Sequence, residues 1–499
     1  MKTPNALFRL VSAAALAAAT AHPAAAQVDL SKLVWIGDSE GAGFSAGCLT
    51  KRVQVDSPGA ILVRANGNGD YEQPIINDPG LGGCLVLTSL APSFGNEPST
   101  GTPANLALPR PYNNLSVGGC AIHDMVYATT GANASPGTCR NTIDLVLRNA
   151  VFGIGSQVDQ AVSLGPSFVI LANFGNDYLG AVLSGTIIDG VTVTPVASFS
   201  ADTNTALAKL KARQAKGLVT GVVDVTNIPF TTTLPPFLTS GGKLVLNPAT
   251  GQPIPLLGPK GCPTGVPACP IPATTLVTLN AAGYLPYGYG IPCIPGVTSS
   301  LPFCNYPLPA AAIDASHPGV LIYASDAALL HQRGLDYNAS TKAAAAANGY
   351  LYYDPNVLLA KLKTGFDYGG ATINAAFLTG GAFSYDGFHL TPIGYALLAD
   401  DMIQFINANM PGANLQRPDL SVYLFAGGTA GGLSGPYTAP YVWAPMNDAE
   451  KATAIEQIFT LDFASQLAAM IGPHRAAVVP GPSAPVQRFE RAAHSDPMP

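Results

Sequence analysis

The feature that most constrains the fold is an alternation of short apolar runs with longer helical patterns. The apolar runs have the length of buried strands, whereas the helical stretches repeat their apolar residues every three or four positions. Strands that alternate with helices form a parallel sheet covered on both faces. We therefore predict an α/β fold with strands near Leu33–Ile36, Ser167–Ala172, Gly217–Val225 and Tyr350–Tyr353, and helices near Ala201–Lys216, Asp326–Asn348 and Thr391–Asn407.

Two regions depart from this alternation. Residues Ile228–Pro318 are dense in proline and glycine and carry four of the eight cysteines. A connection of this length is expected to be an insertion that lies over the sheet. After Pro411 come a glycine-rich stretch, a helix candidate at Asp448–Ile471 and a Pro/Ala-rich end at Pro473–Pro499 that we expect to be mobile. The predicted organisation is one domain over residues 27–412 with the insertion at about 228–318, then an extension over 413–499 whose last ~25 residues are expected to be disordered.

The first 26 residues have the three parts of an export signal. Lys2 and Arg9 give a positive start, Leu10–Ala21 is apolar, and Ala24–Ala26 supplies small residues before Gln27. The alternative is a buried N-terminal helix. The pattern predicts cleavage near Ala26/Gln27 and a secreted or periplasmic protein. No later stretch has the ~18 uninterrupted apolar residues that a membrane span needs.

The amino-acid composition of the chain excludes one class of binding partner. The chain is 48% hydrophobic but only 11% charged, with a net charge of −6. Such a chain can bury a large core, which excludes disorder over most of its length. It has no basic run that could neutralise phosphates, so no nucleic-acid partner is expected.

Export would place the eight cysteines in an oxidising compartment, where an even number favours disulfides. Eight cysteines allow about 105 pairings, so the connectivity does not follow from the count. Short loops favour neighbours in the sequence, and no C-x-x-C pair supports a zinc site. The expected bridges are Cys48–Cys84, Cys120–Cys139, Cys262–Cys269 and Cys293–Cys304.

Four polar clusters fall at predicted strand ends or in loops that can reach them, where ligands of a parallel sheet collect. Ser39 directly follows the first strand, and Asn176 follows the second. Residues 114–119 form a glycine-rich loop whose N–H groups can face an anion. Asp386 lies three residues before His389, where its carboxylate can fix the imidazole tautomer. The alternatives are structural: helix caps for Ser39 and Asn176, a plain turn for the loop and a hydrogen-bonded histidine.

Together the four clusters resemble the sequence blocks of the SGNH/GDSL hydrolase family, in the family's order. The matching stretches are Val34–Ser39, Asn114–Gly119, Phe174–Asp177 and Asp386–Tyr395. The resemblance extends from about Leu33 to Asn409 apart from the insertion, and is nearest to exported, lipase-like members. It implies a flavodoxin-like three-layer α/β/α sandwich around a mainly parallel five-stranded sheet.

The resemblance also implies roles for single residues. Ser39 is expected to be the nucleophile, His389 the base and Asp386 the residue that orients it. Gly119 N–H and the Asn176 amide are expected to hold the oxyanion, with Gly118 as the alternative register because it directly precedes Gly119. The third block departs from the family by carrying Phe174 where a glycine is usual.

Three other patterns compete for a catalytic role. Ser45 lies in a G-x-S-x-G stretch, but the nucleophile elbow of α/β-hydrolases needs its serine on the turn straight out of a strand. The same glycines imitate a dinucleotide loop only loosely, since Ser39 replaces the second glycine. His123 and Asp124 could form an acid–base pair, yet no nucleophile motif adjoins them.

The resulting expectation is a secreted serine esterase or lipase that needs no metal and no cofactor. Its substrate is expected to be a small-molecule or lipid ester, and peripheral contact with lipid surfaces is left open. The insertion is expected to shape the mouth of the site, with an acyl groove lined by Ile271, Leu276, Tyr284, Tyr287, Tyr289 and Phe303. The alternative is a distant decoration that only adds surface. A carbohydrate O-acetyl esterase is the alternative within the family. A non-catalytic surface or carbohydrate-binding protein on this fold is the alternative from another class.

Overall fold

The main sheet is parallel and has four strands. The computed structural model describes residues 28–67, 70–89, 93–240, 243–312, 318–368 and 371–425. In the sheet the strand order is β1-β4-β5-β12, and every neighbouring pair is parallel. The strands are β1 (Leu33–Gly37), β4 (Phe168–Ala172), β5 (Lys216–Thr220) and β12 (Leu351–Tyr353).

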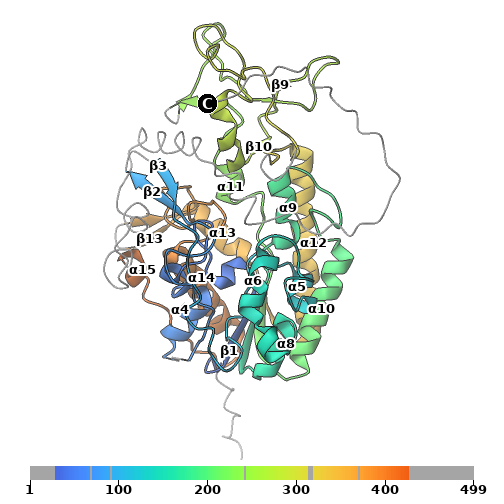
Figure 1. Cartoon of the computed structure of the whole chain (residues 1–499), viewed down its shortest axis with the longest axis vertical. Coiled ribbons are helices and arrows are strands. Elements are labelled where there is room, and N and C mark those ends of the chain that lie inside the picture. The colour runs from blue at the N-terminus through green and yellow to red at the C-terminus, as the bar shows by residue number, and fades with distance from the viewer. Residues whose placement is uncertain are drawn as a thin grey trace, which may run out of the picture.

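Helices cover both faces of this sheet (Figure 1). Every residue of β1 and β4 is buried, as a doubly covered sheet requires. The parallel α/β class is therefore confirmed. One face carries α5 (Ile122–Tyr127), α8 (Gln157–Leu164), α10 (Val196–Lys211) and α12 (Ala324–Asn348), and the other carries α4 (Pro58–Ala65) and α14 (Pro392–Asn409).

A fifth strand was expected, but the sheet has four. The segment after residue 112 runs beside β1, where Trp35 N–H donates to Asn113 O and Leu115 N–H donates to Trp35 O, both at 2.8 Å. Only a single bridge, between Trp35 and Asn114, forms there. The Asn114 side chain turns inward instead and donates to Gly41 O at 2.7 Å, which ties this loop to the residues after β1.

The two long predicted helices near the C-terminal half are confirmed as α12 and α14. β5 ends at Thr220, five residues before the predicted end, because side-chain amides replace a strand partner. Asn338 accepts from Val222 N–H at 2.7 Å and donates to Val222 O at 3.1 Å. The helix predicted over Ala201–Lys216 covers Val196–Lys211 instead. It begins directly after Pro195, and it ends before Lys216 because that residue already belongs to β5.

Residues 228–318, called segment 228–318 below, project from one end of the α/β body (Figure 1). All four expected disulfides are present, and two of them lie in this segment. β11 (Leu321–Ile322) follows the segment and pairs with β10 (Leu276–Val277) inside it. The other described elements of the segment are short: α11 (Pro229–Thr232), β6 (Thr239–Ser240), β7 (Lys243–Leu244), β8 (Leu257–Gly258), β9 (Cys269–Pro270), η1 (Leu279–Gly283) and η2 (Leu285–Tyr287).

The predicted export signal, the helix candidate at Asp448–Ile471 and the Pro/Ala-rich end lie outside the described residues. Among the helices that are described, none combines the length and hydrophobicity that a membrane crossing demands.

The remaining helices and strands of the described chain are short. They are α2 (Ser39–Ala42), α3 (Lys51–Gln54), α6 (Thr138–Leu147), α7 (Asn149–Phe152), α9 (Asn176–Ser184), α13 (Pro355–Thr364), α15 (Ser421–Phe425), β2 (Leu85–Ser89), β3 (Ser93–Asn96), β13 (Phe366–Tyr368) and β14 (Ala371–Ile373).

Candidate active site

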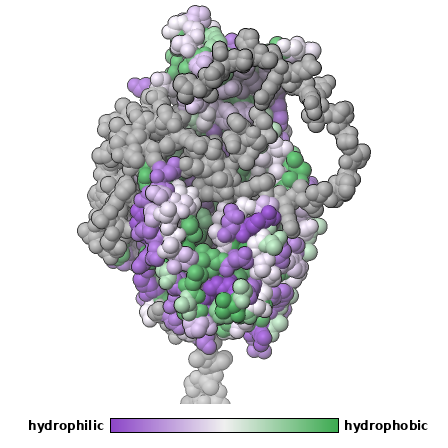
Figure 2. Space-filling model, in the orientation of Figure 1, coloured by the Kyte–Doolittle hydropathy of each residue, from purple (hydrophilic) through white to green (hydrophobic). Residues whose placement is uncertain are grey.

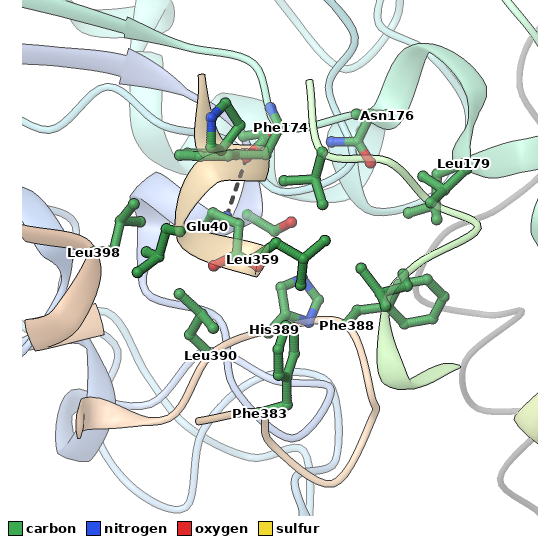
Figure 3. A pocket seen from close by; sticks show the side chains of 18 of the residues that line it. Glu40, Phe174, Asn176, Leu179, Leu359, Phe383, Phe388, His389, Leu390 and Leu398 are labelled. Carbon is green, nitrogen blue, oxygen red and sulfur yellow. Dashed lines mark hydrogen bonds between the residues drawn. The ribbon is translucent and has the colours of Figure 1, made fainter. Parts of the chain in front are cut away.

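Three of the predicted site residues line one cavity at the carboxyl end of the sheet. Ser39 follows β1, Asn176 follows β4, and His389 lies in the loop before α14; all three line the cavity. Figure 3 shows Asn176 and His389 around this space. Asp386 lies behind His389, away from solvent. The structure thus brings together residues separated by up to 350 positions in the sequence.

The loop after β1 holds Ser39 at the first position of α2. Asp38 caps this helix and is buried, with its carboxylate accepting from Glu40 N–H at 3.1 Å and from Phe174 N–H at 2.7 Å. Burial raises the pKa of Asp38 to about 7, against the lowering effect of these two hydrogen bonds. The Asp38–Phe174 bond fixes the serine loop against the loop that carries Asn176.

Glycine is required where these loops meet. A Cβ on Gly37 would lie 2.8 Å from Ala172 O, and a Cβ on Gly41 would lie 2.4 Å from Ser116 Oγ. Either contact would push apart the backbones that β1, β4 and the 113–117 segment bring together. Gly37 and Gly41 therefore have a packing role that is separate from chemistry.

The His389 imidazole is held by a fully buried carboxylate. Nδ1 lies 2.7 Å from Asp386 Oδ2, and that oxygen also accepts from Gly47 N–H at 2.8 Å. The other oxygen, Oδ1, accepts from the Ser384 hydroxyl and from the N–H groups of Phe388 and His389, each at 2.9 Å. Five donors on one carboxylate stabilise its ionised form, so Asp386 fixes both the orientation and the tautomer of the ring.

The charge around His389 favours the imidazolium. Burial works against protonation, but the charge and hydrogen bond of Asp386, with smaller contributions from Glu40 and Asp38, raise the pKa of His389 to about 9. His389 also keeps the pKa of Asp386 below its usual value, although burial opposes this. Among the described residues, Ser39 Oγ and His389 Nε2 share the cavity without a direct hydrogen bond.

Asn176 is tied to the glycine-rich loop. Its Nδ2 donates to Cys120 O at 3.2 Å, and the side chain is buried at the start of α9. Gly119, next to that carbonyl, has φ +77°, which L side chains rarely adopt. Gly119 and Gly118 are not among the residues that line the cavity, so their oxyanion role stays a prediction.

A disulfide supports this loop. Cys120 is bonded to Cys139, and a Cβ on Gly119 would lie 3.0 Å from Cys139 N. A second disulfide, Cys48–Cys84, lies next to Gly47, which donates to Asp386. Two of the four bridges therefore stabilise loops that position the candidate catalytic residues.

For the ester hydrolysis that the family resemblance implies, we expect the double substitution Cys120→Ser/Cys139→Ser to lower kcat about ten- to hundredfold, because a loosened loop would no longer hold the Asn176 amide in place. The matched control is Cys262→Ser/Cys269→Ser, which opens a loop far from Asn176 and should leave kcat unchanged. Steady-state kinetics after a thermal melt that shows both variants folded would check this. Equal rates in the two double variants would contradict it.

The competing patterns have structural roles. Ser45 is buried in a turn, exchanging backbone hydrogen bonds of 3.1 Å with Cys48, and does not line the cavity. Ser45 lies beyond the end of α2 at Ala42 and not on the turn straight out of β1, where a nucleophile elbow would need it. His123 Nδ1 lies 3.0 Å from Asp202 Oδ2, whereas Asp124 bonds to backbone N–H groups, so the competing acid–base pair of His123 with Asp124 does not form.

Most of the cavity wall is apolar. Figure 3 shows His389 surrounded by leucine and phenylalanine side chains. The cavity has a volume of about 90 Å³ and opens to solvent. The apolar lining consists of Phe174, Leu179, Val223, Val225, Ile228, Pro355, Leu358, Leu359, Leu362, Phe383, Phe388, Leu390 and Leu398.

Sequence reasoning placed the apolar wall in the wrong segment. Ile271, Leu276, Tyr284, Tyr287, Tyr289 and Phe303 were expected to line an acyl groove, but none of them lines this cavity. Of the described residues of segment 228–318, only Ile228 at its start lines the cavity. The missed contribution comes from α13, whose apolar residues at positions 358, 359 and 362 have helical spacing that could have revealed a buried face.

Glu40 was also missed. It lines the cavity directly beside Ser39, and its Oε2 is buried with no hydrogen-bond partner among the described residues. Burial, opposed by His389 and reinforced by Asp38 and Asp386, raises the pKa of Glu40 to about 8. An acidic residue next to a candidate nucleophile was the available signal in the sequence.

Three liganding side chains lie close together elsewhere in the described chain, namely Cys120, Asp124 and Cys139. The two sulfurs are joined in a disulfide, so this group is a poor metal site.

Comparison of the chain with protein-family models, curated proteins and solved structures found no match.

Proposed function

We propose that this chain is a serine hydrolase of carboxylic esters. The observation that carries the proposal is that Ser39, a carboxylate-bound His389 and the Asn176 amide line one largely apolar cavity. These are the three components that acyl transfer needs: a nucleophile, an oriented base and an oxyanion donor. The resemblance of the four sequence blocks to the SGNH/GDSL family supports the same reading, including Gly119 as a second donor.

In the proposed reaction, Ser39 Oγ attacks the ester carbonyl while His389 Nε2 takes the hydroxyl proton. Asp386 stabilises the imidazolium through Nδ1. Asn176 Nδ2, with the Ser39 and Gly119 N–H groups, stabilises the oxyanion. His389 then gives its proton to the leaving alcohol, and a water molecule releases the acyl group from Ser39 by the reverse proton route.

The wall of the cavity favours an acyl chain over a sugar. Its lining side chains are mainly aliphatic and aromatic, and the polar ones cluster at the candidate catalytic residues. Burying a methylene against such a wall contributes about 0.8 kcal/mol. We therefore propose an exported lipase- or esterase-like enzyme acting on apolar acyl esters, rather than a carbohydrate O-acetyl esterase.

A series of p-nitrophenyl esters from acetate to palmitate tests this function. We expect hydrolysis that is fastest for chains the cavity can enclose. Leu359→Trp, which fills the wall on α13, should shift the preference towards acetate and lower the rate on longer esters about tenfold or more. The matched control is Val357→Trp, which lies on the same helix but outside the cavity and is exposed.

If Leu359→Trp and Val357→Trp gave the same chain-length profile, the cavity would not be the acyl site. If the wild-type chain hydrolysed none of these esters but released acetate from acetylated sugars, the carbohydrate esterase would replace the present proposal. Absence of activity on both classes would favour a non-catalytic binding protein.

A further inference from the structure

Segment 228–318 contains a long stretch without charge. From Gly261 to Ala312 the sequence has no Asp, Glu, Lys, Arg or His. The only charged residues between Val225 and Ile313 are Lys243 and Lys260, and Lys260 is paired with Asp326 at 3.0 Å. In a water-soluble protein, such a stretch is expected to be buried or to face an apolar partner.

Much of this stretch is exposed instead. Five aromatic residues form what we call the aromatic cluster: Tyr284, Tyr287, Tyr289, Phe303 and Tyr306. The Tyr289 ring stacks on Phe303 at 4.7 Å, and Tyr306 meets both rings edge-on at about 6 Å. Tyr287 and Tyr306 are each 57% exposed, and Phe303 is 38% exposed. These rings therefore present apolar faces to solvent rather than completing a core.

The aromatic cluster is held on a braced loop. The Cys293–Cys304 disulfide closes the loop that carries Phe303, and Phe303 N–H donates to Tyr287 O at 3.0 Å. Gly290 N–H likewise donates to Tyr306 O at 2.6 Å. Because these bonds fix the backbone, an apolar partner would meet preformed rings and little conformational entropy would be lost on contact.

This surface lies at the same end of the molecule as the cavity. The Phe230 ring of α11 stacks on Phe388 at 4.1 Å, and Phe230 N–H donates to Gly387 O at 3.0 Å, in the loop that carries His389. Leu279 of η1 also packs against Gly387, and η2, which ends at Tyr287, follows η1 directly. In Figure 2, the described residues visible at this end include pale and green ones.

We propose that the aromatic cluster docks the protein on the surface of an uncharged lipid or ester aggregate, beside the mouth of the cavity. Tyrosine rings suit this role because they place an apolar body in the aggregate and a hydroxyl in water. The lack of charge selects a neutral or zwitterionic surface, since nothing in the cluster would attract an anionic one. The docking does not depend on the proposed esterase function. Only the additional statement that the docked aggregate is also the substrate rests on that function.

The test is co-sedimentation of the exported chain carrying Ser39→Ala with phosphatidylcholine vesicles. We expect binding that is the same at 50 and 500 mM NaCl and is not increased by added phosphatidylserine. Tyr287→Asp/Tyr306→Asp, in the same background, should weaken binding at least about tenfold. The matched control is Val151→Asp, which adds a charge at a residue of α7 that is 76% exposed on the α/β body.

Several results would overturn the proposal. These are absence of binding, binding that requires phosphatidylserine and disappears at high salt, or an equal loss in the Val151→Asp control. A concentration-dependent dimer that the double tyrosine variant abolishes would instead assign the surface to a second copy of the chain. The rate on soluble p-nitrophenyl acetate, measured with Ser39 intact, reports the esterase function separately and should be unchanged by Tyr287→Asp/Tyr306→Asp.

Discussion

Replacing Ser39 with alanine is expected to lower ester hydrolysis about 10⁴- to 10⁶-fold, because the acyl group then has no oxygen to attach to. The fold should survive, since Ser39 Oγ makes no hydrogen bond among the described residues, and the loop is held instead by Asp38 and Gly37. Rates on a short p-nitrophenyl ester, together with a thermal melt, give the measurement.

Ser45→Ala is the matched control for this prediction. Ser45 has the G-x-S-x-G sequence context of another hydrolase fold but lies in a buried turn outside the cavity. It should keep the wild-type rate, and a fluorophosphonate probe should label Ser39 alone. Labelling of Ser45, or a normal rate in Ser39→Ala, would remove Ser39 from the mechanism.

The parts of the fold that were predicted correctly are those in which local pattern and tertiary structure agree. The strands Leu33–Gly37 and Phe168–Ala172 are continuous apolar runs, and α12 and α14 are long periodic segments. β5 was predicted too long because its sequence stays apolar past Thr220, while the actual end depends on the Asn338 side chain, which comes more than 100 residues later. No local pattern contains that information.

The features of the candidate site that were predicted correctly are also local in sequence, and those that were missed depend on the tertiary fold. The spacing of Asp386 and His389 and the position of Ser39 after a strand were readable, because each is a local pattern with a chemical reason. The partners of Asp386 were not, since Gly47 and Ser384 contact it through the fold. The wall of the cavity was misplaced because apolar residues in a turn-rich segment have no periodicity that reveals their direction, whereas α13 supplies the wall from a face that looked like ordinary core.

The second large effect concerns His389. As the base, it must be neutral to accept the serine proton, and its raised pKa of about 9 keeps it protonated at neutral pH in the free protein. We therefore expect kcat/KM to rise with pH as the imidazolium loses its proton, with the rise near pH 9 rather than near the unperturbed value of ~6.5. His389→Ala should remove this rise and lower kcat/KM by several orders of magnitude.

Replacing Glu40 should lower the pKa of His389 without removing the base. Its carboxyl group lies in the cavity with His389, and its negative charge is one of the influences that raise the pKa of the imidazole. Glu40→Gln keeps the shape but removes this charge, so the pH at half-maximal kcat/KM should fall while the rate at the plateau stays within a few-fold. The pH dependence should be recorded on a small soluble ester, with the Ser39→Ala rate subtracted at each pH to remove spontaneous hydrolysis.

A midpoint that rises or stays fixed in Glu40→Gln would show that this carboxyl group does not act on the base. A pH-independent rate in the wild-type chain would show that His389 is not the group that takes the proton from Ser39.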